Sequence, residues 1–247
     1  IVTAPLGSPE RKNWRDLIPY RPGIYIIDLD LYAGHLVRLE RANALPAIVI
    51  RDLASNEEHA IAFDEAAYSL DTMGSYEFET TNLRFAYSSM TTPSEVYDYD
   101  MAKRTRTLRK RQEIPSGHNA SDYVTTRIMA KAQDGAEVPV SILYRRGLKL
   151  DGSAPLLLYG YGSYGMAMPA SFNANRLSLV DRGFVYAIAH IRGGTDKGGG
   201  WYLDGKREKK TNSFDDFAAC ARELVDARYT SAQRVVGHGG SAGGMLM

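Results

Sequence analysis

A serine framed by glycines lies near the end of the 247-residue sequence, in the pattern Gly239-x-Ser241-x-Gly243. The pattern follows Arg234–Gly237, which predicts a short strand, and precedes Met245–Met247, which is apolar enough to open a helix. Such a strand–turn–helix lifts a serine hydroxyl above the sheet, where it can attack a carbonyl carbon. A Cβ in this turn is expected to clash with the neighbouring strand or helix, which predicts an obligatory glycine at three positions, Gly239, Gly240 and Gly243. The alternative is a glycine turn without a catalytic role.

The other glycines do not form a nucleotide site. Of 23 glycines, sixteen lie in the last 97 residues, which indicates special backbone angles or close contacts there. Gly193-Gly194 and Gly198–Gly200 lack the Lys-Ser/Thr of a P-loop and the spacing of a dinucleotide fingerprint. No cofactor is therefore expected, and no metal either, because the histidines have no ligand-like spacing: His35, His59, His118, His190 and His238.

Composition excludes several classes of protein. Apolar residues make up 44% of the chain and charged residues 24%, which is typical of a globular protein. The net charge of +1 provides no general attraction to nucleic acid or acidic membranes, and no apolar run approaches the length of a spanning helix. The start at Ile1 is not a signal peptide, and the single Cys220 points to a reducing, cytoplasmic location. The oligomeric state stays open.

Lys103–Arg111 places six basic residues in nine. We interpret this run as a solvated last strand or an interdomain connection, with a nucleic-acid patch as the alternative. A nucleic-acid partner is not expected, because the chain has no RNA-binding signature and is almost neutral overall.

The first part of the chain has the pattern of an all-β structure. Short runs rich in β-branched and aromatic residues are separated by turn formers at about 8–15 residue spacing. About 100 residues of this kind provide two propeller blades of four strands, or a sandwich. The expected strands are Ile24–Leu29, Leu36–Leu39, Ala47–Ile50, His59–Phe63, Leu83–Tyr87 and Glu95–Tyr99.

The second part alternates strands and helices, which predicts a mainly parallel α/β sheet. Its expected strands are Tyr123–Ala130, Val138–Tyr144, the doubly buried Ala154–Tyr159, Gly183–His190 and Arg234–Gly237. A short helix is expected over Leu177–Val180, and a longer one over Asn212–Arg228, capped by Asn212 or Ser213. Its apolar face comprises Phe214, Phe217, Ala218, Ala221, Leu224 and Val225, with Cys220 as a buried thiol beside it. Asp196, Trp201 and Tyr202 are expected to pack in a loop at the carboxyl edge of the sheet, with contact to the substrate as the alternative.

Four motifs in order resemble the prolyl oligopeptidase family of serine peptidases, and most closely its oligopeptidase B branch. They are Leu158–Gly165, Ala187–Gly194, Trp201–Lys206 and Gly239–Gly244. The resemblance implies an α/β-hydrolase catalytic domain preceded by a β-propeller. Residues 1–117 would be the last blades of that propeller, and residues 118–247 the first part of the catalytic domain.

The resemblance also assigns roles to residues. It implies that Ser241 is the nucleophile and that the hydroxyl of Tyr161 donates to the oxyanion. The second donor is the backbone N–H of Ala242, which the turn geometry predicts independently. The substrates would be short peptides cleaved after Arg or Lys. A preference for dibasic sites is not expected, because Met168–Ser171 carries no acidic residue.

In α/β-hydrolases the triad Asp and His follow the serine along the chain, and only six residues follow Ser241 here. We therefore expect these residues to be a fragment that is inactive alone. Two other hypotheses stay open: an esterase-like hydrolase on the same fold, and a non-catalytic binding or structural module.

Overall fold

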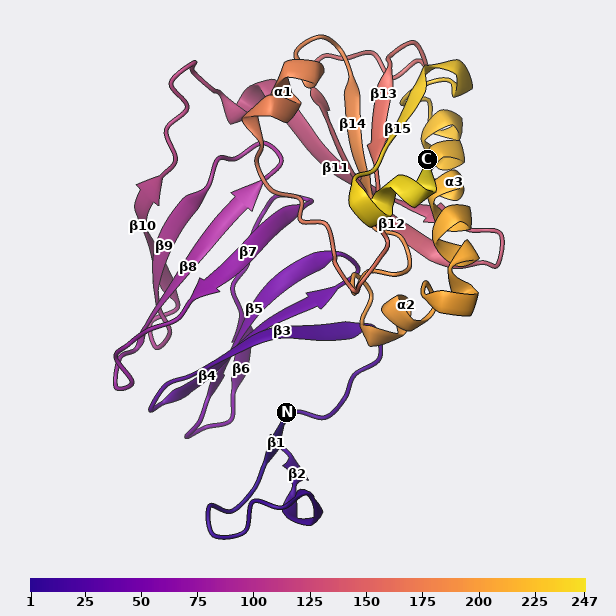
Figure 1. Cartoon of the computed structure of the whole chain (residues 1–247). Coiled ribbons are helices and arrows are strands. Elements are labelled where there is room, and N and C mark those ends of the chain that lie inside the picture. The colour runs from indigo at the N-terminus through magenta and orange to yellow at the C-terminus, as the bar shows by residue number, and fades with distance from the viewer.

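The computed structural model describes residues 1–247 (Figure 1). The first part of the chain consists of strands and a single 3₁₀ turn over Arg11–Asn13. Two antiparallel four-stranded sheets have the orders β3-β4-β5-β6 and β7-β8-β9-β10, as two propeller blades require. A small β1–β2 hairpin lies apart from them at the N-terminus (Figure 1). The strands are β1 (Val2–Thr3), β2 (Arg15–Asp16), β3 (Ile24–Leu31), β4 (His35–Ala42), β5 (Leu45–Asp52), β6 (Glu58–Ala60), β7 (Tyr68–Met73), β8 (Asn82–Ser89), β9 (Glu95–Asp100) and β10 (Thr105–Arg111).

One hydrophobic core joins the two blades. Alternate residues of β8 (Leu83, Phe85 and Tyr87) point into it, and they meet Ile48 and Ile50 of β5 in the facing sheet. The period of two explains why these strands were visible in the sequence. β7 was not predicted, because its sequence Tyr-Ser-Leu-Asp-Thr-Met places a single leucine in the core.

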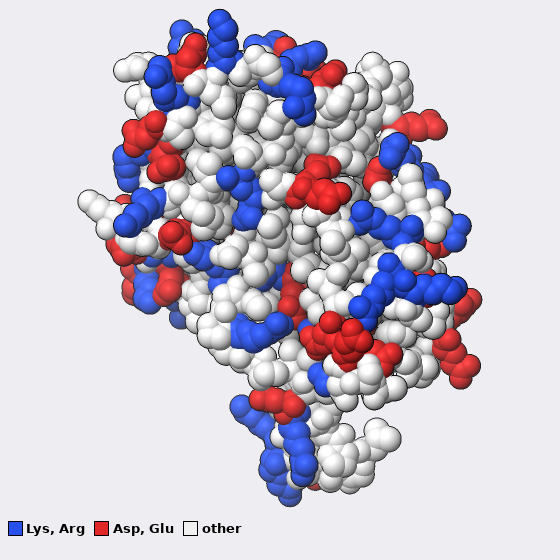
Figure 2. All heavy atoms as spheres, turned by 180° about the vertical axis from the view of Figure 1, so that it is seen from behind, with Lys and Arg blue, Asp and Glu red and all other residues white.

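The basic run forms the exposed edge strand β10, so its interpretation as a solvated last strand is confirmed. Its arginines pair with carboxylates of β9: Arg109 contacts Asp98 at 2.7 Å and Arg111 contacts Glu95 at 2.6 Å. On the face of the molecule in Figure 2, basic and acidic side chains are interspersed and form no single basic patch.

The second part contains a mixed five-stranded sheet in the order β11-β12-β14-β13-β15. β13 pairs in parallel with β14 and β15, whereas β12 is antiparallel to both β11 and β14. The expectation of a mainly parallel sheet therefore holds only for its last three strands. These strands are β11 (Tyr123–Lys131), β12 (Glu137–Arg145), β13 (Leu156–Tyr159), β14 (Val185–Ala189) and β15 (Val235–His238).

Helices cover both faces of this sheet (Figure 1). In β14, Val185 and Ala187 pack in the core that contains Cys220 of α3, whereas Tyr186 packs on the other side with Leu177 of α1. This burial on both sides explains the continuous apolar strands of the sequence. The helices are α1 (Ala174–Val180), α2 (Gly199–Leu203) and α3 (Thr211–Asp226), and short 3₁₀ turns cover Ala120–Asp122, Arg207–Lys209, Ala232–Arg234 and Ser241–Leu246.

Helix α3 corrects two predictions. The helix begins at Thr211, so Asn212 and Ser213 lie inside it and do not cap it, and the Ser213 hydroxyl donates to the carbonyl of Arg192 at 2.7 Å. The buried face runs through Ser213, Asp216, Ala219, Cys220 and Leu224, so the predicted Ala218 lies outside it. The prediction used apolar residues only. It therefore left out Ser213 and Asp216, which are polar but are buried because they bind other segments. Cys220 is fully buried, as expected.

The two parts of the chain touch through hydrogen bonds between the ends of blade strands, or the turns that follow them, and the α/β part. These bonds join Arg41 to Thr195, Ala44 to Asp196, Arg127 to Asn43 and Phe172 to Ser88. The expected division after residue 117 falls between the end of β10 at Arg111 and the start of β11 at Tyr123. No helix has both the length and the apolar character needed to cross a bilayer.

Candidate active site

The glycine-framed serine lies in a strained turn. β15 ends at His238, and a 3₁₀ helix begins at Ser241, whose φ is +53°. A residue with a side chain rarely adopts this left-handed backbone conformation, and such strain is concentrated at functional sites. The Ser241 side chain is exposed, so its hydroxyl is accessible to a substrate. The local geometry is that of a nucleophile elbow.

The surroundings of the elbow explain two of its three glycines. A Cβ added to Gly239 would lie 2.2 Å from the carbonyl oxygen of Gly243, and one added to Gly243 would lie 2.9 Å from the carbonyl oxygen of Gly160. Backbone atoms cannot move aside cheaply, so glycine is required at both. A Cβ added to Gly240 would meet no atom within 4 Å, so the expected clash there is wrong.

Tyr161 lies directly against the elbow. Strand β13 ends at Tyr159, level with His238 of β15 in the parallel register, and Tyr161 follows two residues later. The N–H of Gly160 donates to the carbonyl of His238 at 3.1 Å, which ties the two strand ends together. A Cβ on Gly243 would lie 3.1 Å from Cδ2 of Tyr161. The structure thus brings the phenol to the same sheet edge as the serine.

Ala242 follows the serine in the first turn of the 3₁₀ helix over Ser241–Leu246. The first N–H groups of a helix have no acceptor in the preceding turn. Here the N–H of Gly243 donates to the carbonyl of Gly240 at 2.8 Å, whereas the N–H of Ala242 is free to donate to a group that lies beside Ser241. The N–H of Ala242 and the ring of Tyr161 therefore both lie beside the turn that contains Ser241.

A buried ion pair supports the segment beside Tyr161. The Arg192 guanidinium contacts Asp216 of α3 at 2.7 Å and also binds Asp134. Burial alone lowers the pKa of Arg192, but the bonds to the two carboxylates outweigh this and raise it. The next residue, Gly193, packs so closely that an added Cβ would lie 2.0 Å from the carbonyl oxygen of Gly162. The pair therefore fixes the backbone that supports the loop over residues 160–165, which we call the Tyr161 loop.

This pair was not predicted, because Arg192 and Asp216 are 24 residues apart. The available signal was a charged residue directly after a buried strand, since such a residue needs a partner. Trp201 was placed in a loop, but it lies in α2, is 9% exposed, and donates from Nε1 to the carbonyl of His190 at 3.0 Å.

His190 belongs to a second arrangement that the sequence did not reveal. Its Nε2 lies 2.8 Å from Oγ of Ser141, and its Nδ1 lies 3.1 Å from Oδ1 of Asp196. These are the residue types of a catalytic triad, but all three are almost completely buried, and Ser141 lies within β12 and not in a turn. A substrate has no access to this serine. The arrangement is a structural hydrogen-bond network.

His238 is the histidine nearest to Ser241 in the sequence, yet its ring packs on Tyr159, with ring centroids 5.5 Å apart. None of the five histidines makes a hydrogen bond with Ser241. Ser241 therefore has no histidine in hydrogen-bond contact that could serve as its general base.

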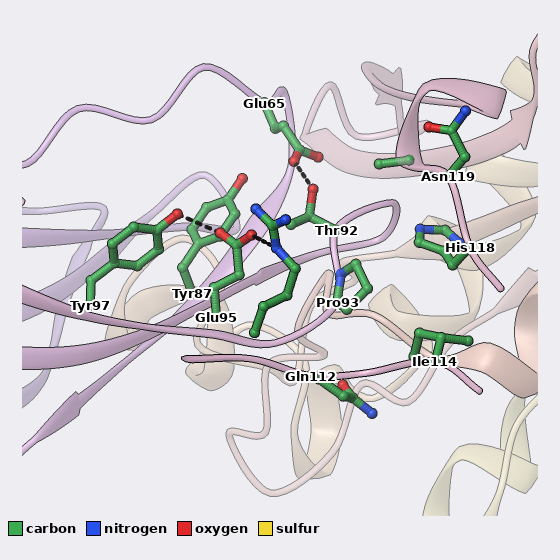
Figure 3. A pocket seen from close by; sticks show the side chains of 12 residues that line it. Glu65, Tyr87, Thr92, Pro93, Glu95, Tyr97, Gln112, Ile114, His118 and Asn119 are labelled. Atoms are coloured by element: carbon green, nitrogen blue, oxygen red, sulfur yellow. Dashed lines mark hydrogen bonds and ion pairs between the residues drawn. The ribbon is translucent and has the colours of Figure 1, made fainter. Parts of the chain in front are cut away.

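A cavity of about 510 Å³ lies elsewhere, between the second blade and the segment that leads to the α/β part (Figure 3). Its carboxylates are already occupied: Glu65 accepts from Thr92, and Glu95 accepts from the hydroxyl of Tyr97 and from Arg111. The cavity shares no lining residue with the elbow. It is not the candidate active site.

Comparisons with known families agree with both parts of the chain. The model described as "Prolyl oligopeptidase, N-terminal beta-propeller domain" matches residues 1–112. The model described as "Prolyl oligopeptidase family" matches residues 170–247. Together the two models cover well over half of the chain.

Individual relatives match the chain over its whole length. It is 43% identical to dipeptidyl aminopeptidase BI of Pseudoxanthomonas mexicana and 32% identical to protease 2 of Moraxella lacunata, covering 100% of this chain and 34% and 35% of theirs. The closed form of oligopeptidase B from Trypanosoma brucei with covalently bound antipain superposes with a TM-score of 0.88 at 35% identity, covering 98% of this chain and 35% of that one. The chain thus spans about a third of the length of these relatives.

Proposed function

The chain belongs to the prolyl oligopeptidase family, and from this we propose that the protein to which it belongs is a serine peptidase that cleaves short peptides. The observation that carries the proposal is the elbow itself. Ser241 has a left-handed backbone, an exposed side chain and two glycines that no other residue can replace. A cytoplasmic location is part of the proposal, supported by the single, buried thiol of Cys220.

In the proposed reaction, Oγ of Ser241 attacks the scissile carbonyl carbon and gives its proton to a general base. The base passes this proton to the amine that leaves as the peptide bond breaks, and water then hydrolyses the acyl-enzyme that remains. The negative charge on the carbonyl oxygen is stabilised by the N–H of Ala242 and the hydroxyl of Tyr161. Both donors are held in place before the substrate binds, so they do not have to reorganise as the charge develops. The general base that activates Ser241 would come from outside these 247 residues.

The proposed specificity is cleavage after Arg or Lys, as in the oligopeptidase B branch that the motifs resemble. A second candidate is the release of dipeptides from a free N-terminus. It is favoured by the 43% identity to an enzyme named dipeptidyl aminopeptidase, against 32% for protease 2. The two activities differ in whether the substrate must carry a free amino group.

A matched pair of substrates separates these candidates. We would assay the intact peptidase with Ala-Arg-aminomethylcoumarin and with the same peptide blocked at its N-terminus. An endopeptidase cleaves both, whereas a dipeptidyl aminopeptidase cleaves only the free peptide. Preferential turnover of the corresponding esters, with no turnover of either amide, would instead support the esterase hypothesis.

The role of Ser241 is tested with a fluorophosphonate, which reacts with activated serines. We expect its mass on the peptide that contains Ser241, and neither labelling nor turnover in Ser241→Ala. Labelling or turnover that persists in this variant would refute the proposed function, and with it every role assigned to the elbow.

A further inference from the structure

The backbone that follows Tyr161 has an unusual conformation. Gly162, Tyr164 and Gly165 all have positive φ, of +64°, +56° and +72°. Tyr164 has a side chain and is strained in this region. A segment of this kind is not held by a regular ladder of hydrogen bonds, so contacts from outside must fix it, and with it the position of the Tyr161 hydroxyl.

One contact comes from Lys210. Its Nζ donates to the carbonyl of Gly162, to Oγ of Ser163 at 3.0 Å and to Oγ of Ser213 at 3.3 Å. An ammonium group has three donors, and here each of them has an oxygen acceptor. Two of the three acceptors belong to the residues that directly follow Tyr161. The third anchors the ammonium group to helix α3.

Lysine is a poor choice for this position on local grounds. Lys210 joins the 3₁₀ turn over Arg207–Lys209 to the 16-residue helix α3, and its own backbone is helical, with φ −62° and ψ −28°. The helix dipole places positive charge at this end, which disfavours a cation. Burial lowers the pKa of Lys210, and no nearby carboxylate offsets this effect. Residues that break local rules in this way are concentrated at functional sites.

We propose that Lys210 is a positioning residue for the oxyanion site, and that its ammonium group holds the Tyr161 loop so that the Tyr161 hydroxyl lies where negative charge develops. This inference rests on the proposed function. Lys210 itself touches neither the substrate nor Ser241. Its effect passes through the carbonyl of Gly162, next to Tyr161 in the chain. A lysine that only stabilises the fold would act on stability and not through Tyr161.

The test uses the intact peptidase and the variant Lys210→Met, which keeps an apolar stem of similar length but removes the ammonium group. We expect kcat to fall about 10- to 100-fold, because small displacements of a catalytic group have effects of this size. We expect KM to change by less than about twofold, because the interaction lost is made in the transition state. Lys209→Met is the matched control, since Lys209 is exposed and binds only Asp204. It should leave both constants unchanged.

The same Lys210 substitution, made in an enzyme that already carries Tyr161→Phe, distinguishes a positioning role from an effect on general stability. In Tyr161→Phe, which has no hydroxyl to position, Lys210→Met should lower kcat by less than about threefold. Equal losses in both backgrounds would overturn the proposal, and so would an unchanged kcat in Lys210→Met alone. If Lys210→Met does not fold, as judged by its Tm, Lys210→Gln takes its place, and the same dependence on Tyr161 is expected.

These outcomes are separable from the fate of the proposed function. If turnover requires Ser241 but does not respond to Lys210→Met, only the role of Lys210 is refuted. If turnover persists in Ser241→Ala, the proposed function is refuted and the inference about Lys210 with it.

Discussion

Ser241 has a φ of +53° in the tight turn between β15 and the following 3₁₀ helix. The carbonyl oxygen of Gly243 faces Gly239 across this turn, so the space for a Cβ on Gly239 is already filled. Gly240, between Gly239 and the serine, has an ordinary extended backbone with φ −109° and ψ 153°. Of these two adjacent glycines, therefore, only Gly239 has no space for a side chain.

This difference yields a paired prediction. Gly239→Ala should reduce kcat/KM by at least about 100-fold, because a backbone shift at the elbow displaces the nucleophile. Gly240→Ala should keep activity within about threefold, because it meets neither a clash nor backbone strain. The measurement is peptide turnover, with fluorophosphonate labelling as a second readout. Equal losses in the two variants would show that the observed spacing does not govern the elbow.

The proposed role of Tyr161 depends on its hydroxyl group alone, whereas its packing depends on the ring. Tyr161→Phe keeps the ring that contacts Gly243 and removes only the hydroxyl. We expect kcat to fall by about 10²- to 10³-fold, the usual effect of losing one oxyanion donor, with little change in KM. Tyr164→Phe is a suitable control, because the Tyr164 side chain is 77% exposed. A Tyr161→Phe variant with normal kcat would exclude Tyr161 as a donor.

At the scale of elements, α3 is held to the sheet by charge as well as by apolar packing. Asp216 is completely buried and binds both the side chain and the backbone N–H of Arg192. Breaking such a pair leaves a buried charge without its partner. Asp216→Asn should therefore lower the free energy of unfolding by about 3 kcal/mol, as measured by urea denaturation. Asp215→Asn, on the exposed side of the same helix, should change it by less than about 0.5 kcal/mol.

The second blade contains a carboxylate whose contribution depends on pH. Hydrogen bonds from Arg84 and Arg109 outweigh burial and lower the pKa of Asp98 to about 2. The stabilisation is therefore complete above about pH 4, the usual pKa of Asp, and is lost as the pH falls toward 2. Both arginines are about half exposed, so Asp98→Asn should destabilise the protein by only about 1 kcal/mol near pH 6. The difference in Tm between the variant and the wild type should narrow at pH 3, and a difference that widens would contradict this sign.

Some of these elements could be predicted from the sequence and others could not. The two blades and the central strand β13 were predictable, because β8 alternates with a period of two and Ala154–Tyr159 is continuously apolar. The start of α3 was not, because propensity favours Asn212 or Ser213 as the cap, whereas both the Ser213 hydroxyl and the Lys210 ammonium bind loops far away in the sequence. Tertiary contacts overrode the local preference.

The candidate site divides in the same way. The elbow is a continuous motif, so Ser241, Ala242 and the glycines could be located from spacing alone. Tyr161 could be named only through the family resemblance, because 80 residues separate it from the serine and nothing local shows that they meet. Arg192 and Lys210, which hold the loop from behind, depend on side-chain bonds that no pattern in the sequence records.

At the scale of the whole molecule, the candidate site is linked to the blades. The segment that begins at Arg192 supports the Tyr161 loop through Gly193, and a few residues later it contacts the first blade. There, Thr195 accepts a hydrogen bond from Arg41, and the carbonyl of Asp196 accepts one from the N–H of Ala44. The blades therefore contact the same stretch of backbone that supports Tyr161, the proposed oxyanion donor.

The final prediction concerns a polypeptide of these 247 residues assayed alone. A serine hydroxyl is a poor nucleophile without an adjacent base, and the nearest histidine in sequence, His238, packs on Tyr159 instead of Ser241. We expect no turnover of an arginyl-aminomethylcoumarin peptide above that of Ser241→Ala. The donors alone provide only about 10³–10⁴-fold over water, which an ordinary assay does not detect. Strand β15 also leaves an open sheet edge with Val236 half exposed, so we expect the polypeptide to self-associate in sedimentation experiments. Robust turnover that requires Ser241 would show that a base is already present among these residues, with His238→Ala as the first variant to examine.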